Sequence, residues 1–442
     1  MVKLTKIFVL LLLLTVTTAG CFRSEPLIPA STAPAEKPAP STGQAAVPNH
    51  LSIWTHYGGI ETMAAKFKES YPDLSVDVKV IPYSEYVGAY LQALADGKPP
   101  DVMMVDSSDF GNFSAIEGLE DLLKPPYQAG KYRNDFSPSL WDSGMSADGI
   151  ELIALPLSTA PTVTYYREDI MKQYGFPSEP EELAKYMEDP ANWLNMAKKL
   201  REHNIYLTQW VNETVQLFER SEGIFDRKLN FMRYNEAFHK AVDIAKKVND
   251  FGLEAHLDVW GDLGRKAVQD GTIAMMYFGT WGVEQIKEWA PETAGKWRET
   301  RLPFGLYGWQ NSTNFLLPSN GANKEMGWKF IEFAVTEYSK EGLSGAVPAY
   351  LPARGNAKEL AATNPFLGGQ KTYALHEDLM TRVREFPATP LDVKAQEIWE
   401  NEIASGIEKR LSTKQIIADA RDKIEQSLSK EKQILLDTMK KK

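Results

Sequence analysis

One stretch near the N-terminus decides the fold: LSIWTHYGGIETMAAKFKESYPDLSVDVKVIPYSEYVGAYLQALADGKPPDVMMVD, residues 51–106. Its apolar positions predict a strand at 51–54, a helix at 60–70 and a strand with one buried face at 74–80. A second helix follows and leads to a buried strand at 102–105. Strands and helices that alternate in this way predict a parallel open sheet with right-handed crossovers.

Polar and aromatic residues follow each of these three strands. Tyr57 comes after the first strand, Tyr83 after the second, and Asp106 and Asp109 after the third. In open sheets of this kind, ligands bind beyond the carboxyl ends of the strands. The sequence therefore predicts a binding site at this edge of the sheet.

The remainder of the body continues the alternation. Further strands are predicted at 152–156, 162–166, 273–277 and 315–318. Helices are predicted across 181–250, around Trp328 and over 413–439. The chain as a whole therefore belongs to the α/β class, and it contains no internal repeat.

Composition removes several classes of function. The 442 residues carry a formal net charge of −10, which is a poor match for nucleic acid. The single cysteine, Cys21, excludes intrachain disulfides, cysteine-based zinc sites and iron–sulfur clusters. The 11 tryptophans, 18 tyrosines and 19 phenylalanines are more than packing alone usually needs, so some of them are candidates for ligand contacts.

The N-terminus has the pattern of an export signal. Lys3 and Lys6 precede a short apolar run and small residues, which predicts a signal peptide at 1–20 and not a membrane-spanning helix. The sequence Thr18-Ala19-Gly20-Cys21 resembles the bacterial lipobox, although Thr18 replaces the usual aliphatic residue. Cys21 would then be the lipid-modified, palmitate-bearing first residue; the alternative is a plain secretory peptide with an incidental cysteine.

Residues 21–48 are predicted to form a tether. Proline, alanine, serine and threonine dominate this segment, and it has almost no large apolar side chains with which to fold. A lipid anchor, a tether and a folded body together describe a protein held at the outer face of a membrane.

Enzyme motifs are missing from the sequence. It contains no Gly-x-Ser-x-Gly elbow, no His-Glu-x-x-His zinc pair and no phosphate-binding loop, and the six histidines are scattered. We therefore expect no catalytic residue, no metal site and no cofactor. A glycosidase needs only two carboxylates that the fold brings together, so Asp106 and Asp109 leave that possibility open.

The ordered set of motifs in the body resembles the extracellular solute-binding proteins of bacterial ABC importers, in the sugar-binding family to which maltose-binding protein belongs. The segments that carry the resemblance are DVMMVD (101–106), ALP (154–156), TYYRED (164–169), GTIAMM (271–276), GTW (279–281) and NKEMGWKFIEF (323–333). The resemblance implies a two-lobed α/β fold of the periplasmic-binding-protein type, with a hinge and an interlobe ligand cleft. The implied division is 49–160 with 311–355 for lobe one, and 161–310 with 356–442 for lobe two.

The family also implies particular ligand contacts. Trp281 matches a tryptophan that stacks on sugar, Asp106 with Asp109 matches an acid that accepts sugar hydroxyls, and Tyr166 matches a tyrosine near the hinge. Flat aromatic rings and short polar groups are what a pyranose needs, because it presents C–H faces and a fringe of hydroxyls. Topology alone adds five further candidates: Tyr57, Tyr83, Trp210, Tyr307 and Trp309.

The resemblance implies a function in transport. The protein would be a monomeric binding component, anchored outside a membrane of the Gram-positive type, that captures a mono- or oligosaccharide and delivers it to ABC permease subunits. One alternative is another solute, such as a glycerol phosphodiester or a uronate oligosaccharide, for which Arg167, Arg265 or Arg354 could supply positive charge. A second alternative is a secreted carbohydrate-active enzyme.

Overall fold

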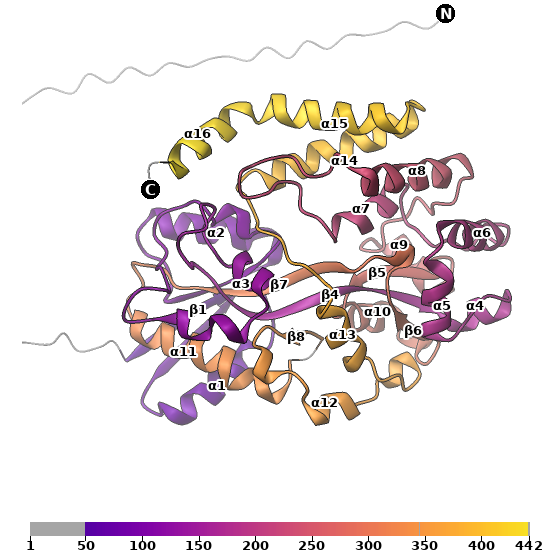
Figure 1. Cartoon of the computed structure of the whole chain (residues 1–442). Helices are drawn as coiled ribbons and strands as arrows, with labels where there is room; N and C mark the ends of the chain where they lie inside the picture. Colours follow the sequence, from indigo (N-terminus) through magenta and orange to yellow (C-terminus); the bar gives the residue numbers. More distant parts are fainter. Residues whose placement is uncertain (1–48, 344, 441–442) are drawn as a thin grey trace, which may run out of the picture. The chain divides into compact units, whose positions relative to one another are not determined.

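The computed structural model describes residues 49–343 and 345–440, so the predicted signal peptide, Cys21 and the tether lie outside it (Figure 1). The first elements follow the predicted order. They are β1 (His50–Thr55), α1 (Ile60–Ser70), β2 (Ser75–Val80), α2 (Tyr83–Ala95) and β3 (Val102–Asp106). The predicted limits of α1 are confirmed at both ends, because Ile60, Met63 and Phe67 give it one buried face and Pro72 prevents its continuation.

One mixed sheet holds the strands together. After α3 (Pro138–Ser143) come β4 (Leu155–Arg167), β5 (Met275–Gly279), β6 (Trp297–Thr300), β7 (Gly308–Leu316) and β8 (Val347–Pro348). The strand order is β2-β1-β3-β7-β4-β5, and β6 and β8 also pair with β4. The parallel arrangement predicted from residues 51–106 is confirmed for β1, β2 and β3, whereas β7 and β4 run antiparallel to their neighbours.

Two strands differ from the sequence-based expectation. The predicted strand at 162–166 and the end of the one at 152–156 belong to one long strand, β4, because the residues between them stay extended and pair with β7; residues 152–154 precede it. The face of β2 that its alternation predicted is only partly buried: Val76 and Val78 pack against the core beside β1, whereas Val80 is 49% exposed. The reason is position: β2 is the edge of the sheet and pairs with β1 alone.

The helices of the middle of the chain pack on the far half of β4. They are α4 (Glu168–Gln173), α5 (Pro180–Met187), α6 (Pro190–Arg201), α7 (Glu213–Glu219), α8 (Glu236–Asp250), α9 (Asp262–Asp270) and α10 (Gly282–Trp289). Helix α8 shows why they form. The Asn235 side chain accepts hydrogen bonds from the backbone N–H groups of Ala237 and Phe238, at 3.0 and 3.2 Å, and the apolar residues that follow share one buried face.

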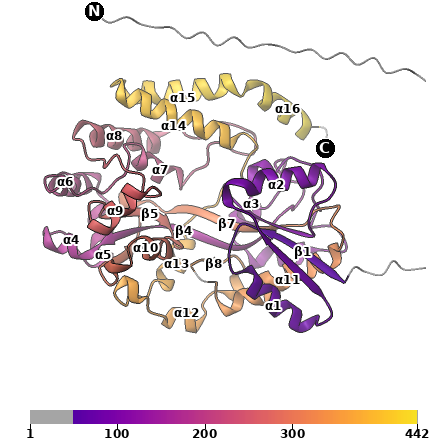
Figure 2. The ribbon, with the colours of Figure 1, turned by 180° about the vertical axis from the view of Figure 1, so that it is seen from behind.

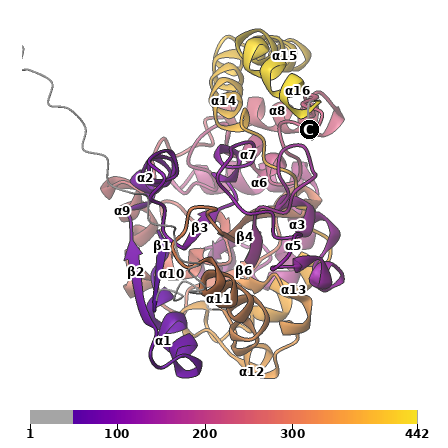
Figure 3. The ribbon, with the colours of Figure 1, turned by 90° about the vertical axis from the view of Figure 1, so that its left-hand side faces the viewer.

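The last helices are divided between the two halves of the molecule. They are α11 (Lys324–Thr336), α12 (Ala357–Ala361), α13 (Tyr373–Met380), α14 (Asp392–Glu408), α15 (Thr413–Ser427) and α16 (Ser429–Met439). Helix α11 packs with β1 and α1 in a first apolar core. The buried residues of α14 and α15 belong instead to a second core, with those of α6 and α8. Figures 1 and 2 show α14 and α15 above α7 and α8 from opposite sides, and Figure 3 shows this arrangement from the end of the sheet.

Within the described residues, no helix is both long and apolar enough to cross a bilayer.

Candidate functional site

The centre of the molecule is the antiparallel pair formed by β4 and β7. The pairing runs from Leu155 opposite Phe315 to Thr162 opposite Gly308, and β3 pairs with β7 along its other edge. Two cavities border β7 where it passes between the first and second cores. We call the cavity beside Asn311 the aromatic cavity and the cavity beside Gln310 the polar cavity.

The aromatic cavity gathers three of the predicted residues. Tyr57, Tyr83 and Trp281 line it, together with parts of α1, β4 and β7. Its volume is about 610 Å³, within the range of roughly 300–1,000 Å³ that is usual for small-molecule sites. Tyr57 comes from the loop after β1 and Tyr83 is the first residue of α2, whereas Trp281 comes from the other half of the chain, so the cavity is built from both sides.

Trp281 is held rigidly at the wall of this cavity. It stands between β5 and α10, and its ring stacks on Phe278 at 5.6 Å with an interplanar angle of 25°. A side chain at Gly279 would meet the Trp281 Nε1 atom at 2.4 Å, so only glycine lets the indole lie this close to the strand. The Nε1 atom is buried and has no hydrogen-bond partner among the described residues. It is therefore a buried donor that the described part of the chain leaves without an acceptor.

Asp106 is buried, and all of its acceptor positions are in use. One carboxylate oxygen accepts from the Tyr57 hydroxyl at 3.1 Å and from the Asn311 amide at 2.6 Å. The other accepts from the backbone N–H and the hydroxyl of Ser108, at 2.9 and 2.7 Å. An ionised carboxylate has about four acceptor sites, and these four hydrogen bonds occupy them. The role of Asp106 in this structure is therefore to hold Tyr57 and β7 in place.

Asp109 and two tyrosines form the next layer of the same wall. The Tyr86 hydroxyl donates to Asp109 at 2.6 Å, and burial together with this carboxylate raises the pKa of Tyr86. Tyr83 lies with its hydroxyl 3.4 Å from that of Ser108, and burial raises its pKa to about 12. Both tyrosines therefore stay neutral at physiological pH and can act as hydrogen-bond donors.

His56 completes the aromatic cavity, and the sequence did not single it out. Its ring centre lies 3.8 Å from that of Tyr57 and 4.4 Å from that of Tyr86. Burial lowers the pKa of His56, against the opposing effect of Asp106 and Asp109, so the ring is neutral at pH 7. Its buried Nε2 atom has no partner within 49–343 and 345–440. The only signal in the sequence was its place directly after β1.

Two predicted contacts do not line either cavity because they are tied into the second half of the molecule. Tyr166 is fully buried in the second core, and its hydroxyl donates to the Ser178 carbonyl at 2.6 Å. Trp210 is 42% exposed, 6.4 Å from the ring of His256. The structure does not bring either residue together with Trp281.

Two further predicted contacts lie near the start of β7. The Tyr307 hydroxyl accepts a hydrogen bond from Arg382 at 2.8 Å, and Tyr307 lines neither cavity. Trp309 lines the polar cavity but is only 5% exposed, and its Nε1 atom donates to Ser312 at 3.1 Å. Trp309 is therefore a wall of the polar cavity that already has a hydrogen-bond partner.

The arginines that the sequence offered for an anionic ligand lie elsewhere. Arg167 forms a 2.7 Å ion pair with Asp169, Arg265 donates to the Trp260 carbonyl and Arg354 to the Pro348 carbonyl. None of the three lines the aromatic or the polar cavity.

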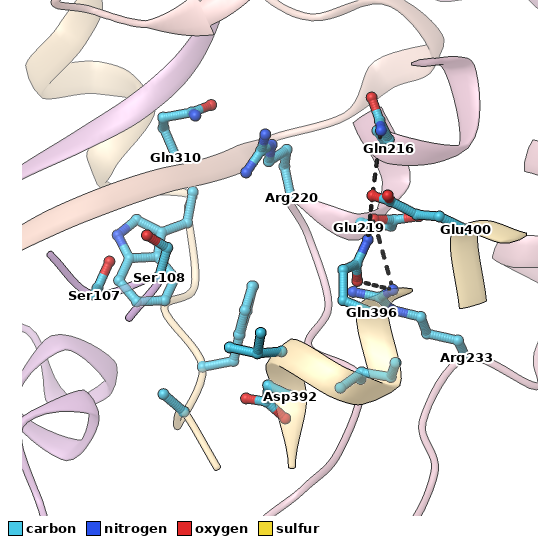
Figure 4. A pocket seen from close by; sticks show the side chains of 15 residues that line it. Ser107, Ser108, Gln216, Glu219, Arg220, Arg233, Gln310, Asp392, Gln396 and Glu400 are labelled. Carbon is cyan, nitrogen blue, oxygen red and sulfur yellow. Dashed lines mark hydrogen bonds and ion pairs between the residues drawn. The ribbon is translucent and has the colours of Figure 1, made fainter. Parts of the chain in front are cut away.

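The polar cavity has a volume of about 400 Å³ and lies between the loop after β3, helix α7 and helix α14 (Figure 4). Its polar lining residues are Ser107, Ser108, Gln216, Glu219, Arg220, Arg233, Gln310, Asp392, Gln396 and Glu400. Gln396 organises one side: its amide N–H groups donate to Glu219 at 2.7 Å and to Glu400 at 2.8 Å. Its carbonyl oxygen accepts from Arg233 at 2.8 Å.

Arg220, the residue that follows α7, stands apart from this network. Its guanidinium has no hydrogen bond or ion pair with any other described residue, and Figure 4 shows no interaction drawn to it. Burial lowers the pKa of the guanidinium, although the nearby Glu219 carboxylate opposes this change. Arginine remains charged in proteins, so Arg220 is a charged donor that faces the cavity without a partner.

Asp392 in the same cavity makes a testable contribution to stability. Burial raises its pKa to about 6, although Thr389 donates two hydrogen bonds to it. The folded state thus binds the proton more tightly than the unfolded state, and this group's stabilisation is complete below pH 4 and is lost as pH rises towards 6. Between pH 4.5 and 7, ionisation of Asp392 should lower the free energy of unfolding of the unaltered protein by about 1–2 kcal/mol. The Asp392→Asn variant should lack this decrease, which urea unfolding at the two pH values measures. The exposed Asp422→Asn variant should leave the pH profile unchanged.

The described residues contain no group of three or more His, Cys, Asp or Glu side chains placed to hold a metal ion.

Comparison with known proteins identifies the class. The family of bacterial extracellular solute-binding proteins matches residues 54–341, and the chain belongs to this family. The fold is accordingly the two-lobed α/β fold with a hinge and an interlobe cleft, as predicted. Members of this family are binding proteins rather than enzymes.

Three solved structures show the same fold at low sequence identity. The galacto-N-biose/lacto-N-biose I-binding protein of Bifidobacterium longum, in complex with lacto-N-biose, has a TM-score of 0.71 at 16% identity, with 86% of this chain and 97% of that chain covered. A binding protein from B. animalis subsp. lactis, in complex with β-1,6-galactobiose, has a TM-score of 0.69 at 18% identity, with 87% and 98% covered. An ABC substrate-binding protein from Listeria monocytogenes, in complex with cycloalternan, has a TM-score of 0.67 at 18% identity, with 86% and 98% covered.

Proposed function

We propose that this chain is the saccharide-binding component of an ABC importer, and that the saccharide binds in the aromatic cavity. One observation carries the proposal: around this cavity, aromatic rings coincide with buried polar atoms that have no partner among the described residues. These atoms are Trp281 Nε1, His56 Nε2 and Thr159 Oγ1. A buried polar group without a partner costs roughly 1–3 kcal/mol, so a ligand that satisfies these atoms gains affinity.

The chemistry of the cavity suits a sugar better than most other solutes. The Trp281 indole, backed by Phe278, offers a flat surface for the C–H face of a pyranose. Tyr57 and Tyr83 offer hydroxyl groups, and the lining residues include no lysine or arginine to attract an anion. The three related structures were solved with bound oligosaccharides, which is consistent with this choice.

Closure of the two lobes is the proposed mechanism. The aromatic cavity has walls from both halves of the chain, so a bound saccharide contacts both lobes and favours the closed state over the open one. The β4–β7 pair that connects the halves has register shifts at Pro156/Ser158 and Ala160/Pro161. These irregular positions have fewer regular ladder bonds, and we propose them as the hinge, with lobe one and lobe two divided as the sequence predicts.

The location completes the proposal. Residues 1–20 would direct export, Cys21 would carry the lipid anchor and residues 21–48 would tether a monomeric body outside the membrane. There the closed form would deliver its saccharide to the permease subunits. Asp106, Asp109, Tyr166, Trp210, Tyr307 and Trp309 remain proposed contacts, and closure is the event that would bring the more distant ones to the ligand.

Calorimetric titration tests this function. The mature body should bind at least one member of a panel of glucose, maltose, maltotriose, galactose, β-1,6-galactobiose, lacto-N-biose and cycloalternan. We expect micromolar or tighter dissociation constants for one series and none for amino acids or peptides. Binding of another solute class, with no heat from any saccharide, would disprove the proposal.

A further inference from the structure

The polar cavity contains a charged donor that the rest of the described chain leaves free. The backbone of β7 fixes the stem of Arg220, because a side chain at Gly308 would lie 2.6 Å from the Arg220 Cβ atom. The guanidinium beyond this stem has no hydrogen bond or ion pair within the described part of the chain. Figure 4 shows it between Gln310 on one side and Glu219 on the other. A partly buried guanidinium without a partner is costly, which points to an occupant that accepts hydrogen bonds.

The carboxylates around Arg220 are already satisfied by other donors. Glu219 accepts from the Trp399 indole at 2.7 Å and from Gln396 at 2.7 Å, and it lies 3.6 Å from Arg233. Glu400 accepts from Gln216 at 3.3 Å and from Gln396 at 2.8 Å. The donors that remain open to an occupant therefore include those of Arg220, with the amide N–H groups of Gln310 and the hydroxyl of Ser107 beside them, whereas the Ser108 hydroxyl already donates to Asp106.

The balance of charge favours a neutral occupant. Arg220 and Arg233 supply the positive charges of the lining, whereas Glu219, Glu400 and Asp392 supply the negative ones. An anionic group that approached Arg220 would also face these carboxylates at short range in a poorly solvated space. Hydroxyl oxygens accept from a guanidinium without that repulsion.

The two cavities both border β7. Gln310 lines the polar cavity, and the next residue, Asn311, lines the aromatic cavity. Their rims meet again where the Tyr83 hydroxyl lies 3.4 Å from the Ser108 hydroxyl. This shared border is the route by which a chain of sugar units that begins at Trp281 would reach Arg220.

We propose that the polar cavity is a second sugar subsite, in which Arg220 donates hydrogen bonds to the hydroxyl oxygens of a neutral glycosyl unit. This inference rests on the saccharide binding proposed above. It narrows the ligand to an oligosaccharide of at least two units, and it makes the unit at Arg220 uncharged. A uronate at this position is disfavoured by the carboxylates of the lining.

Calorimetric titration of two variants, Arg220→Met and Arg220→Lys, tests the subsite. Each variant is titrated with two series of ligands. One is galactose, β-1,6-galactobiose and digalacturonate, and the other is glucose, maltose and maltotriose. In the series that binds, Arg220→Met should weaken the di- or trisaccharide about 10- to 100-fold and leave the monosaccharide within twofold. Arg220→Lys, which keeps the charge but loses the planar donor fork, should give an intermediate loss. Arg384→Met, at an exposed position outside both cavities, is the matched control and should change nothing. Thermal unfolding of each variant reports on folding.

The outcomes separate this inference from the proposed function. If the unaltered protein binds no saccharide of the full calorimetric panel, the proposed function fails. If it binds them and Trp281→Ala weakens them, but Arg220→Met leaves oligosaccharide affinity unchanged or weakens the monosaccharide equally, the second subsite is wrong. Digalacturonate that binds more tightly than β-1,6-galactobiose, with a preference lost in Arg220→Met, would overturn the neutral character of the subsite.

Discussion

Replacing Trp281 by alanine should weaken saccharide binding about 10- to 100-fold, by analogy with the roughly 1–3 kcal/mol that aromatic stacking contributes per base in nucleic-acid complexes. The indole is set in place by its stacking on Phe278 and its close seat on Gly279, so it needs no rearrangement to receive a sugar ring. Its removal takes away the flat surface and the free Nε1 donor together. Calorimetric titration with the tightest-binding saccharide of the panel measures the effect.

Trp260 provides the matched control for this variant. Its ring lies 6.5 Å from that of Trp281, yet it is 48% exposed and does not line the aromatic cavity. Trp260→Ala should therefore change the affinity by less than about twofold. Trp281→Ala with unchanged affinity and an unchanged unfolding temperature would mean that Trp281 only packs against the protein.

Replacing Trp399 by alanine should remove about 3–5 kcal/mol of stability, the usual cost of truncating a buried tryptophan. Trp399 is completely buried in the second core, with its ring centre 5.6 Å from that of Phe238 at 86°. Its Nε1 atom donates to Glu219 at 2.7 Å, so the substitution leaves both a cavity and a carboxylate that has lost a donor. Urea unfolding should show a lower midpoint.

Trp210→Ala is the control for the stability prediction. Trp210 is 42% exposed, and truncation there should cost no more than about 0.5 kcal/mol. A loss below about 1 kcal/mol for Trp399→Ala would show that α14 contributes little to the second core. In that case the wall of the polar cavity would also be less rigid than its hydrogen bonds suggest.

Local pattern was enough to predict the elements near the N-terminus and the place of Trp281. The spacing of Ile60, Met63 and Phe67 defines one face of α1 whatever its neighbours are, because helix periodicity is a local property. Likewise the buried strand predicted at 273–277 places Trp281 just beyond its carboxyl end, whereas the contact of Trp281 with sugar was implied by the resemblance. The two-lobed fold was predicted through the resemblance of motifs in order, which is also a property of the sequence alone.

Contacts between distant segments were decided only by the tertiary structure. Asp106 looked like a free acceptor in the sequence, but β7 lies next to β3 and brings the Asn311 amide, 205 residues away, onto its carboxylate. No sequence pattern distinguishes Arg220 from the other arginines. It is a candidate donor because its Cβ atom packs closely against Gly308 and because other side chains donate to the nearby carboxylates.

The sequence by itself determined the order of strands and helices, the export signal pattern and the presence of aromatic residues at strand ends. The tertiary structure decided which of these residues share a cavity, because strand order and helix packing bring together groups that no local spacing connects. Tyr57, Tyr83 and Trp281 meet around one cavity for this reason, and Tyr166 is carried into the second core. Periodicity is read along the chain, whereas a binding site is a property of the distances between its parts.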